Sequence, residues 1–427
     1  MKFQAPRGTQ DIVSPAVEAW QLLEATARRV MTRYGYAEVR TPIFESTELF
    51  TRGIGEATDI VQKEMYTFAD RKGRSLTLRP EGTAPVVRAY IEHNLGARRM
   101  PCRAWYLGPI FRYERPQAGR YRQHHQVGAE LLGSSVPEAD FEAIDLFVRL
   151  LTELGLSDVT VRLNSVGDEN SRPAFREILK EALRPRLSEL CEDCRRRFEL
   201  NVLRVFDCKV PGDRAIVAGL PTMVEHLDPA SKAHHDRLRE LLTAAEIRFE
   251  EDPRLVRGLD YYTRTVFEVH HPNLGAPSAV GGGGRYDNLV SECGGPPTPA
   301  VGFSSGIERL LMALSAEGID TTGAARPDVM IVGTDRLATA VLASRLRRDF
   351  RVEVDLMERS FASQMKQADR VSARFALILG DDEMAGDYAT LRDMTAGTES
   401  RIPRDRLDAE LALRLTTLMP DAAPKEK

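Results

Sequence analysis

Residues 111–133 carry the side chains whose types and spacing most clearly suggest chemistry. Four arginines flank a Pro-Gln-Ala-Gly turn signal at 116–119. They are Arg112, Arg115, Arg120 and Arg122. A strand that reverses through this turn would present several guanidiniums to one small region, and their planar donor groups match the oxygens of phosphates and carboxylates. The stretch predicts an oxyanion site, although on its own it fits an arginine-rich surface hairpin better.

The segment after the turn adds two polar side chains of a different kind. Gln126 and Glu130 are four residues apart, so on a strand they lie on the same face. A neutral amide and an acid beside phosphate-binding arginines predict a site that holds a polyphosphate next to a cationic or amino-bearing partner.

Two further stretches could contribute to such a site, and each has a plainer alternative. Glu81 and Thr83 lie at a strand-to-helix transition, where they could bind an ammonium group or simply cap the helix. Arg257 could stabilise charge on a phosphate oxygen in a transition state, or it could form a surface ion pair with Asp260.

Glycines mark the last two stretches. Residues 281–284 are all glycine, which could let a ligand pack against bare backbone or could form a flexible turn. Residues 301–309 predict a strand, a glycine turn and a helix whose first turn holds Arg309, an arrangement suited to polyphosphate. The dinucleotide and P-loop glycine patterns are absent, and Gly-x-Ser-x-Gly is not formed at Ser304 or Ser305, so Rossmann binding, P-loop hydrolysis and serine hydrolysis are disfavoured.

Composition and charge are those of an ordinary globular protein. The 427 residues suffice for two or three domains, with 42% hydrophobic and 29% charged residues. No apolar run approaches the roughly 20 residues of a membrane span, and the N-terminus lacks the core of a signal peptide, so we expect a cytoplasmic protein. A net charge of −4 argues against nucleic acid over the whole surface but allows a local basic groove.

The five cysteines are too few and too irregular for a disulfide framework. Cys191-x2-Cys194 with Cys208 suggests zinc, but a closed zinc site has four ligands, and His226 is only a distant fourth. We favour free thiols and expect no structural metal.

Hydrophobic periodicity and turn residues divide the chain into four parts. Strands and helices mix over 1–167, a charged and mostly helical segment interrupts them over 168–252, and strands resume over 253–320. After a polar linker, residues 327–420 alternate strand and helix like a compact α/β domain, and the last residues look disordered. Predicted helices cover 14–34, 83–94, 137–154, 175–190, 233–245, 307–314, 337–350 and a segment from 360. Predicted strands cover 37–43, 75–78, 104–113, 159–163, 261–270, 300–303, 329–332, 352–354 and 375–379.

Taken together, these segments resemble the class II aminoacyl-tRNA synthetases. Residues 111–114 with the following loop resemble motif 2, residues 302–309 resemble motif 3, and the helix and strand that end at Pro42 resemble motif 1, the dimer-forming element. Four other segments are similar to signatures of one family in the class, histidyl-tRNA synthetase. They are residues 7–11, 58–66, 78–83 and 257–262.

The resemblance spans nearly the whole chain and implies an α+β fold. It implies a six-stranded antiparallel catalytic sheet with a helical insertion, followed by a C-terminal α/β anticodon-binding domain. The implied reaction activates L-histidine with ATP to histidyl-adenylate and pyrophosphate, and then transfers histidine to the 3′ end of tRNA-His with release of AMP. The expected partners are ATP with Mg²⁺, histidine, tRNA-His and a second copy of the chain.

Carried over by position, the motifs imply a role for each candidate side chain. Seven would bind histidine: Glu81, Thr83 and Gln126 at its ammonium group, Glu130 and Tyr262 at the imidazole nitrogens, and Tyr261 and Tyr286 as pocket walls. Five would bind ATP: Arg112 at the α-phosphate, Arg120 and Arg309 at the outer phosphates, and Glu114 and His124. Arg257 would join Arg112 as a catalytic residue by stabilising charge on the α-phosphate, as a metal ion does elsewhere in the class.

The motif 2 loop raises two finer points. At His124 the family usually has phenylalanine, whose ring stacks on adenine. Because imidazole can ionise near neutral pH, we expect ATP affinity to weaken on acidification. Gln117 and Arg122 are candidates for contact with the extra 5′ nucleotide of tRNA-His.

The alternative within this fold is a regulatory subunit of ATP phosphoribosyltransferase, a related binding protein without synthetase activity. That family generally lacks the anticodon domain and the catalytic arginines. Here the residues from 327 onward resemble the anticodon domain, and Arg112, Arg257 and Arg309 are all present. The sequence therefore favours the enzyme.

Overall fold

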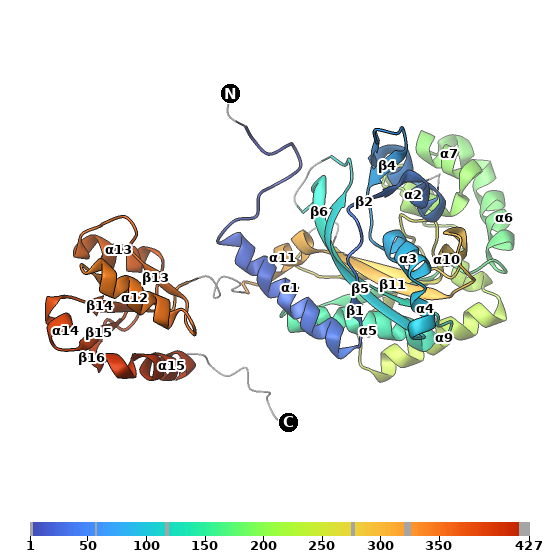
Figure 1. The fold of residues 1–427 in the computed structure, drawn as a ribbon. Coiled ribbons are helices and arrows are strands. Elements are labelled where there is room, and N and C mark those ends of the chain that lie inside the picture. The colour runs from blue at the N-terminus through green and yellow to red at the C-terminus, as the bar shows by residue number, and fades with distance from the viewer. Residues whose placement is uncertain (1–2, 56–57, 116–118, 275–277, 320–325, 418–427) are drawn as a thin grey trace. The chain divides into compact units, whose positions relative to one another are not determined.

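The chain folds as two units, residues 1–321 and 322–427. The computed structural model describes residues 3–55, 58–115, 119–274, 278–319 and 326–417 (Figure 1). The predicted linker at 316–326 lies partly outside the described residues, and the tail at 420–427 lies wholly outside them. Within the described part of the chain, no helix combines the length and the apolar character needed to cross a membrane.

The first unit is organised around a sheet that has eight strands among the described residues. In spatial order they are β1 (Ala37–Glu38), β5 (Cys102–Phe111), β6 (Gln123–Leu132), β11 (Ala300–Gly306), β10 (Ala279–Arg285), β9 (Thr263–His270), β7 (Thr160–Ser165) and β8 (Phe249–Glu251). The six strands from β5 to β7 pair antiparallel, and only the short edge strands pair parallel with their neighbours. The six-stranded antiparallel sheet is therefore present, with one parallel strand added at each edge.

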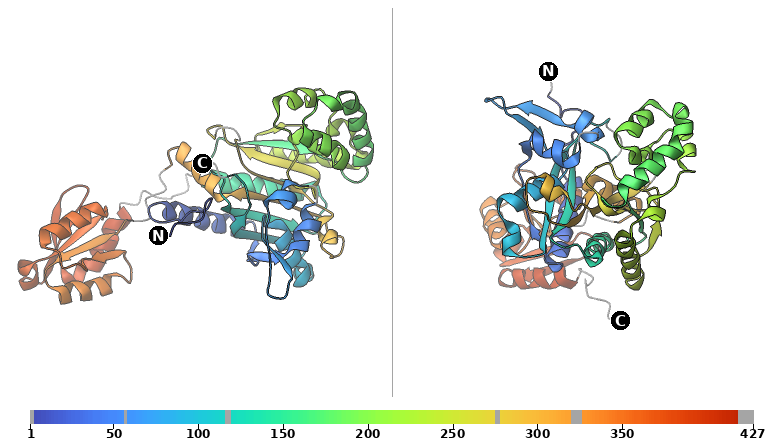
Figure 2. Two further views of the ribbon diagram at one scale, coloured as in Figure 1. Left: turned by 90° about the horizontal axis from the view of Figure 1, so that it is seen from above. Right: turned by 90° about the vertical axis from the view of Figure 1, so that its right-hand side faces the viewer.

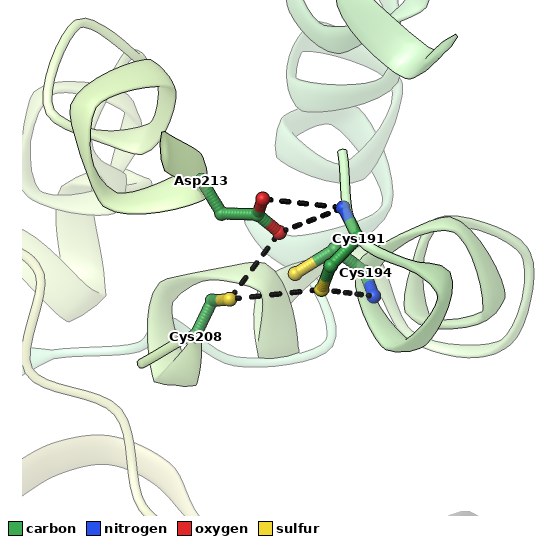
Figure 3. A group of neighbouring side chains, drawn as sticks. All are labelled: Cys191, Cys194, Cys208 and Asp213. Carbon is green, nitrogen blue, oxygen red and sulfur yellow. Dashed lines mark hydrogen bonds between the residues drawn. The ribbon is translucent and has the colours of Figure 1, made fainter. Parts of the chain in front are cut away.

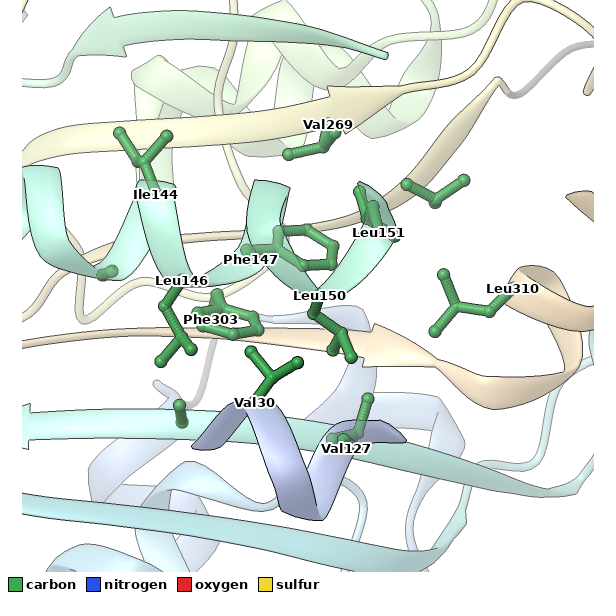
Figure 4. Close-up of a cluster of buried hydrophobic side chains, with 14 of the residues drawn as sticks. Val30, Val127, Ile144, Leu146, Phe147, Leu150, Leu151, Val269, Phe303 and Leu310 are labelled. Atoms are coloured by element: carbon green, nitrogen blue, oxygen red, sulfur yellow. The ribbon is translucent and has the colours of Figure 1, made fainter. Parts of the chain in front are cut away.

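Helices cover one face of this sheet and enclose the main core. They are α1 (Ala16–Arg33), α5 (Pro137–Glu153), α9 (Pro229–Ala244) and α11 (Ile307–Ala316). The stripe of Ile144, Phe147 and Leu151 on α5 recurs every three to four residues, so one side of the helix faces the sheet. Phe147 stacks on Phe303 of β11 with ring centroids 4.6 Å apart (Figure 4). This packing fixes the strands and leaves their other face for the site.

The opposite face carries α3 (Thr83–Glu92) and the short α10 (Leu289–Glu292). Strand alternation turns Val266 and Ala300 to this face, where they pack with Val87 and Tyr90 of α3. A small sheet of β2 (Phe44–Ser46), β4 (Ser75–Leu78) and β3 (Tyr66–Ala69) adjoins α2 (Thr47–Ile54). Two short elements complete this part of the fold: η1 (Ile60–Glu64) contacts α2, and α4 (Leu95–Arg98) contacts α3.

A helical segment with its own apolar cluster follows β7. It contains α6 (Arg172–Leu183), η2 (Arg184–Glu189), α7 (Glu192–Leu200), η3 (Val202–Asp207), α8 (Pro211–Val217) and η4 (Met223–His226). In the right-hand view of Figure 2 this segment (green) and the small sheet (blue) rise from the main sheet as separate masses. Although α9 and β8 also fall within 168–252, α9 packs in the main core and β8 joins the main sheet.

The second unit has its own sheet of five strands among its described residues. Their order is β13 (Val352–Val354), β12 (Val329–Gly333), β14 (Phe375–Leu379), β15 (Tyr388–Asp393) and β16 (Glu399–Pro403). The helical elements are α12 (Arg336–Leu346), α13 (Phe361–Arg370), α14 (Asp381–Ala385), η5 (Arg404–Arg406) and α15 (Leu407–Thr417). The parallel β13–β12–β14 half and the antiparallel β14–β15–β16 half make this an α/β unit.

Most predicted elements are found within a few residues of their expected bounds, and two local expectations are wrong. The strand predicted over 37–43 covers only Ala37–Glu38, because Pro42 cannot donate to a ladder and the chain turns away before it. The Ser14-Pro15 pair predicts a serine N-cap with proline at the first helical position, but Pro15 itself occupies the N-cap position of α1, and no side chain caps the helix.

Candidate active site

A cavity of about 660 Å³ opens on the face of the main sheet that carries α3 and α10, opposite α1, α5, α9 and α11. Its walls come from the η1 segment, the β5–β6 loop, strands β10 and β11, the 256–262 segment and residues 191–210 of the helical segment. Twelve of the thirteen predicted site residues line it. They are Glu81, Thr83, Arg112, Glu114, Arg120, His124, Gln126, Arg257, Tyr261, Tyr262, Tyr286 and Arg309. The thirteenth, Glu130, lies directly behind Thr83 and Tyr286.

Guanidiniums gather in one part of the cavity. The Nε of Arg112 donates to the carbonyl of Pro80 at 2.7 Å, and the Nε of Arg309 donates to the carbonyl of Ala279 at 2.8 Å. These bonds fix the two side chains at the wall of the cavity. Burial and the nearby charge of Arg120 lower the pKa of Arg309. Because the charges of Arg120 and Arg309 repel each other, this part of the cavity favours a polyanion.

Glu114 moderates this positive charge. Its carboxylate lies 4.0 Å from Arg112 and 3.7 Å from Arg120. Both pairs are at the long end of ion-pair distances, so an incoming phosphate can compete for the same guanidiniums.

The loop arginines do not all reach the cavity. Arg115 is exposed, and Arg122 lies over the ring of Tyr113, with its guanidinium carbon 4.0 Å from the ring centroid. The expectation that the hairpin presents all four to one region therefore holds for Arg112 and Arg120 only. Gln117 lies outside the described residues.

A buried acid defines another part of the site. One oxygen of Glu130 accepts from the hydroxyl of Thr83 at 2.7 Å, and the other accepts from the phenol of Tyr286. Burial raises the pKa of Glu130 to about 8; the two hydroxyl hydrogen bonds oppose this rise and the charge of Glu81 adds to it. A largely protonated acid is thus poised to ionise when a suitable donor arrives.

Glu81 is bound to the start of α3. Its two carboxylate oxygens accept from the backbone N–H groups of Thr83 at 2.6 Å and Ala84 at 2.7 Å. This is the helix-capping alternative that the sequence left open, and it fixes a carboxylate that also lines the cavity. The two interpretations of Glu81 are therefore compatible.

Gln126 offers the cavity an oxygen that has no other use. Among the described residues its buried Oε1 has no hydrogen-bond partner. A buried acceptor without a partner is costly, so the site gains free energy when a ligand donor satisfies it.

Arg257 is held by a chain of polar contacts that sequence reasoning missed. Its Nη1 donates to Oε1 of Glu268, whose Oε2 lies 3.1 Å from Nε2 of His270. The Nδ1 of His270 lies 2.8 Å from Oγ of Ser278. Although burial tends to raise it, the pKa of Glu268 is lowered by the hydrogen bond from His270 and by the charge of Arg257. The signal in the sequence was the Glu-x-His alternation, which places both side chains on one face of β9.

Three sequence interpretations are wrong here. Asp260 does not pair with Arg257; its Oδ1 lies 3.1 Å from Nδ2 of Asn201 and 3.4 Å from Nη1 of Arg204. Residues 281–284 are not a turn but the middle of strand β10. His124 does not ionise near neutral pH, because burial and the charge of Arg112 lower its pKa to about 3.

The helical segment adds cavity residues that no motif indicated. Arg197, Arg204 and Lys209 line the cavity from this side. Nothing in their spacing marks them, because they reach the site only through the fold of the insertion.

Two family models match the chain. The model of histidyl-tRNA synthetase matches residues 8–310, and that of an anticodon binding domain matches residues 329–413. The histidine–tRNA ligase of Moorella thermoacetica is 52% identical over 407 residues, covering 94% of this chain and 96% of the relative. That of Thermotoga maritima is 49% identical over 409 residues, covering 95% and 97%.

Solved structures show the same similarity. Apo histidyl-tRNA synthetase of S. aureus is 37% identical, with a TM-score of 0.81, and the match covers 96% of this chain and 100% of that one. Histidyl-tRNA synthetase of Nostoc is 22% identical, with a TM-score of 0.70 and coverage of 97% and 100%. A Bacillus halodurans protein described as ATP phosphoribosyltransferase regulatory subunit/histidyl-tRNA synthetase is 23% identical, with a TM-score of 0.65 and coverage of 88% and 98%. The last two similarities show a shared fold.

Proposed function

The chain belongs to the histidyl-tRNA synthetase family, and from that membership we propose how its own residues carry out the family's reaction. The activity is that of a histidine–tRNA ligase, which activates histidine with ATP and transfers it to tRNA-His. One observation carries the proposal for the residues: a single cavity is lined by a group of guanidiniums, and a buried, hydrogen-bonded acid lies directly behind its wall.

The guanidiniums serve the activation step. A carboxylate oxygen of histidine attacks the α-phosphorus, a new P–O bond forms, and the bond to the β-phosphate oxygen breaks with release of pyrophosphate. We assign Arg112 and Arg257 to the α-phosphate oxygens, where donors held in place stabilise the charge that builds up in the transition state. The polar chain behind Arg257 supports this role, because it holds the guanidinium before substrate arrives.

The outer phosphates and the metal ion belong beside the same group. We assign the β- and γ-phosphates to Arg120 and Arg309, whose mutual repulsion a polyanion relieves. The adenine lies against His124, which remains neutral. Mg²⁺ accompanies ATP, and Glu114 and Glu308 supply carboxylates in the cavity wall of the kind that Mg²⁺ prefers.

The acid and the tyrosines form the histidine pocket. We propose that Glu130 and Tyr262 pair the two imidazole nitrogens, with Tyr261 and Tyr286 as walls. The ammonium group of the substrate would meet Glu81, Thr83 and the unsatisfied Oε1 of Gln126. A pocket that pairs both ring nitrogens can reject other amino acids by about 10⁴-fold, because each would leave buried polar groups unpaired.

Histidine-dependent ATP–pyrophosphate exchange tests these assignments. Glu130→Ala and Arg257→Ala should each reduce exchange by about 10³-fold or more, since the first leaves an imidazole nitrogen of histidine unpaired and the second removes a charged contact made in the transition state. Glu250→Gln, an exposed change on the edge strand β8, is the matched control and should leave exchange unaltered. Wild-type exchange in either alanine variant would sink the assignment, whereas absence of exchange in the unaltered chain would refute the activity itself.

The regulatory-subunit alternative has less support. Arg112, Arg257 and Arg309 line the cavity here, although a protein without synthetase activity does not need them. The second unit also matches an anticodon binding domain. We propose that this second unit binds the anticodon of tRNA-His, that the segment around Pro42 forms a homodimer, and that the chain works in the cytoplasm.

A further inference from the structure

Four potential metal ligands meet in the helical segment at the edge of the cavity. Cys191, Cys194, Cys208 and Asp213 each offer one ligand atom, and these atoms all lie within 4.8 Å of one another (Figure 3). The sequence supplied only three of them and favoured free thiols. We propose that the four residues bind a structural zinc ion.

The spacing of the ligand atoms fits zinc. Bond lengths of about 2.3 Å to sulfur and 2.0 Å to oxygen place neighbouring ligand atoms of a tetrahedron about 3.5–3.8 Å apart. The sulfurs of Cys191 and Cys208 lie 3.9 Å apart, and Sγ of Cys208 lies 3.3 Å from Oδ2 of Asp213. These two pairs match a zinc site within a few tenths of an ångström, and a pair as wide as 4.8 Å would close by about 1 Å when the ion binds.

Local backbone geometry prepares the ligands. Cys191 is the N-cap of α7, and its sulfur accepts from the backbone N–H of Cys194 at 3.4 Å. A thiolate gains from such a donor and from the positive end of the helix dipole. Both oxygens of Asp213 accept from the N–H of Cys191, Oδ1 at 3.1 Å and Oδ2 at 3.2 Å, so the backbone orients the carboxylate toward the three sulfurs.

The charge of Asp213 favours a metal over free thiols. The residue is 2% exposed, and among the described residues no lysine, arginine or histidine forms an ion pair with it. Buried carboxylates are normally paired with a cation or bound to a metal. A disulfide between Cys191 and Cys208 would bring two sulfurs together but would leave Asp213 and the third thiol unaccounted for.

A zinc ion here would stiffen a wall of the active site. The chain between the ligands contains Asn201 and Arg204, which both hold Asp260 in the segment that carries Arg257. Cys191 and Cys208 themselves line the cavity, which gives the ion a path of entry. The metal would thus fix the insertion against the catalytic residues without touching substrate.

Metal content of the full-length protein tests the proposal. Protein from cells grown with zinc should carry one zinc per chain by mass spectrometry of the metal. When zinc has been removed with a chelator, addition of Co²⁺ should produce the sulfur-to-metal charge-transfer absorption of a tetrahedral thiolate site. Cys194→Ser and Asp213→Ala should lower Zn²⁺ affinity by more than about 100-fold, because the loss of a ligand exceeds that of an outer hydrogen bond. Cys293→Ser, a thiol outside the cluster, is the control and should bind like the unaltered chain.

Several results would overturn the inference. One is metal-free protein that gives no Co²⁺ spectrum after reconstitution under reducing conditions. Another is equal zinc binding by the Cys194→Ser variant and the Cys293→Ser control. An intact mass that shows two hydrogens lost from these cysteines in freshly isolated protein would assign the cluster to a disulfide instead. If Cys194→Ser fails to fold, Cys191→Ser changes a partly exposed ligand and allows the same comparison.

Discussion

The raised pKa of Glu130 predicts a specific pH dependence of histidine binding. In the free pocket the acid is largely protonated at neutral pH, because burial raises its pKa to about 8. If its carboxylate accepts an imidazole N–H, the bound form is ionised and binding releases a proton. Protonation therefore opposes binding, so affinity should rise with pH until the pH passes the pKa of the free pocket.

The size of the effect follows from the fraction of Glu130 that is ionised. With a pKa of about 8, roughly 9% is ionised at pH 7 and 50% at pH 8, and the apparent dissociation constant varies inversely with this fraction. The dissociation constant of histidine should fall by about fivefold from pH 7 to 8 and by less than about twofold from pH 8 to 9. The imidazole of free histidine, with a pKa of about 6.5, is already mostly neutral in this window.

Isothermal titration of histidine in buffers with different ionisation enthalpies measures both the affinity and the proton release. About 0.9 proton should be released per histidine at pH 7. Glu130→Gln cannot ionise, so it should bind histidine more weakly and show neither the slope nor the release. A dissociation constant that stays level between pH 7 and 8, or proton uptake on binding, would refute the assigned role of Glu130.

Two further predictions concern the ATP end of the cavity. Glu268→Gln should lower the rate of pyrophosphate exchange by about 10- to 100-fold, since a hydrogen bond to a charged group contributes about 1.5–3 kcal/mol. The Michaelis constant for histidine should change little. An unchanged rate at an unchanged melting temperature would show that Arg257 does not depend on this contact. Because the pKa of His124 is about 3, its ring should stay neutral between pH 5.5 and 8. The Michaelis constant for ATP of the unaltered chain, divided by that of His124→Phe, should therefore stay constant over this range. A ratio that grows on acidification would mean that His124 does ionise.

The sequence predicted the fold best where local pattern decides it. The apolar stripe of α5 and the buried strand β14 were found near their observed ends, because periodicity and length are properties of one segment. The placement of α9 in the main core could not be read in this way. Its own pattern says only that it is an amphipathic helix, and the partner that covers its apolar side lies some 90 residues earlier, in α5.

The site shows the same contrast between local pattern and tertiary structure. Motifs in the sequence identified the thirteen candidate residues, yet the contacts that position them and shift their pKa values depend on tertiary structure. Glu268 reaches Arg257 only because the segment that precedes β9 folds back against that strand, and His124 loses its charge only because the fold buries it beside Arg112. Asp213 joins the cysteines through the turn between η3 and α8.

The glycines in the central strands connect these observations. Glycine weakens a strand by roughly 0.5–1 kcal/mol relative to alanine, so several in the middle of a sheet need a compensating reason. A methyl group at Gly302 would lie 1.8 Å from Oε2 of Glu130, one at Gly282 would lie 3.0 Å from Nη1 of Arg257, and one at Gly284 would lie 2.8 Å from the ring of Tyr262. Each glycine thus clears space beside a proposed site residue, and Gly282 and Gly284 also clear the carbonyls of Phe267 and Thr265, each 2.4 Å from the methyl position. The departure from strand propensity in β10 and β11 is therefore the local cost of bringing an acid, a guanidinium and a phenol against the backbone of a rigid sheet.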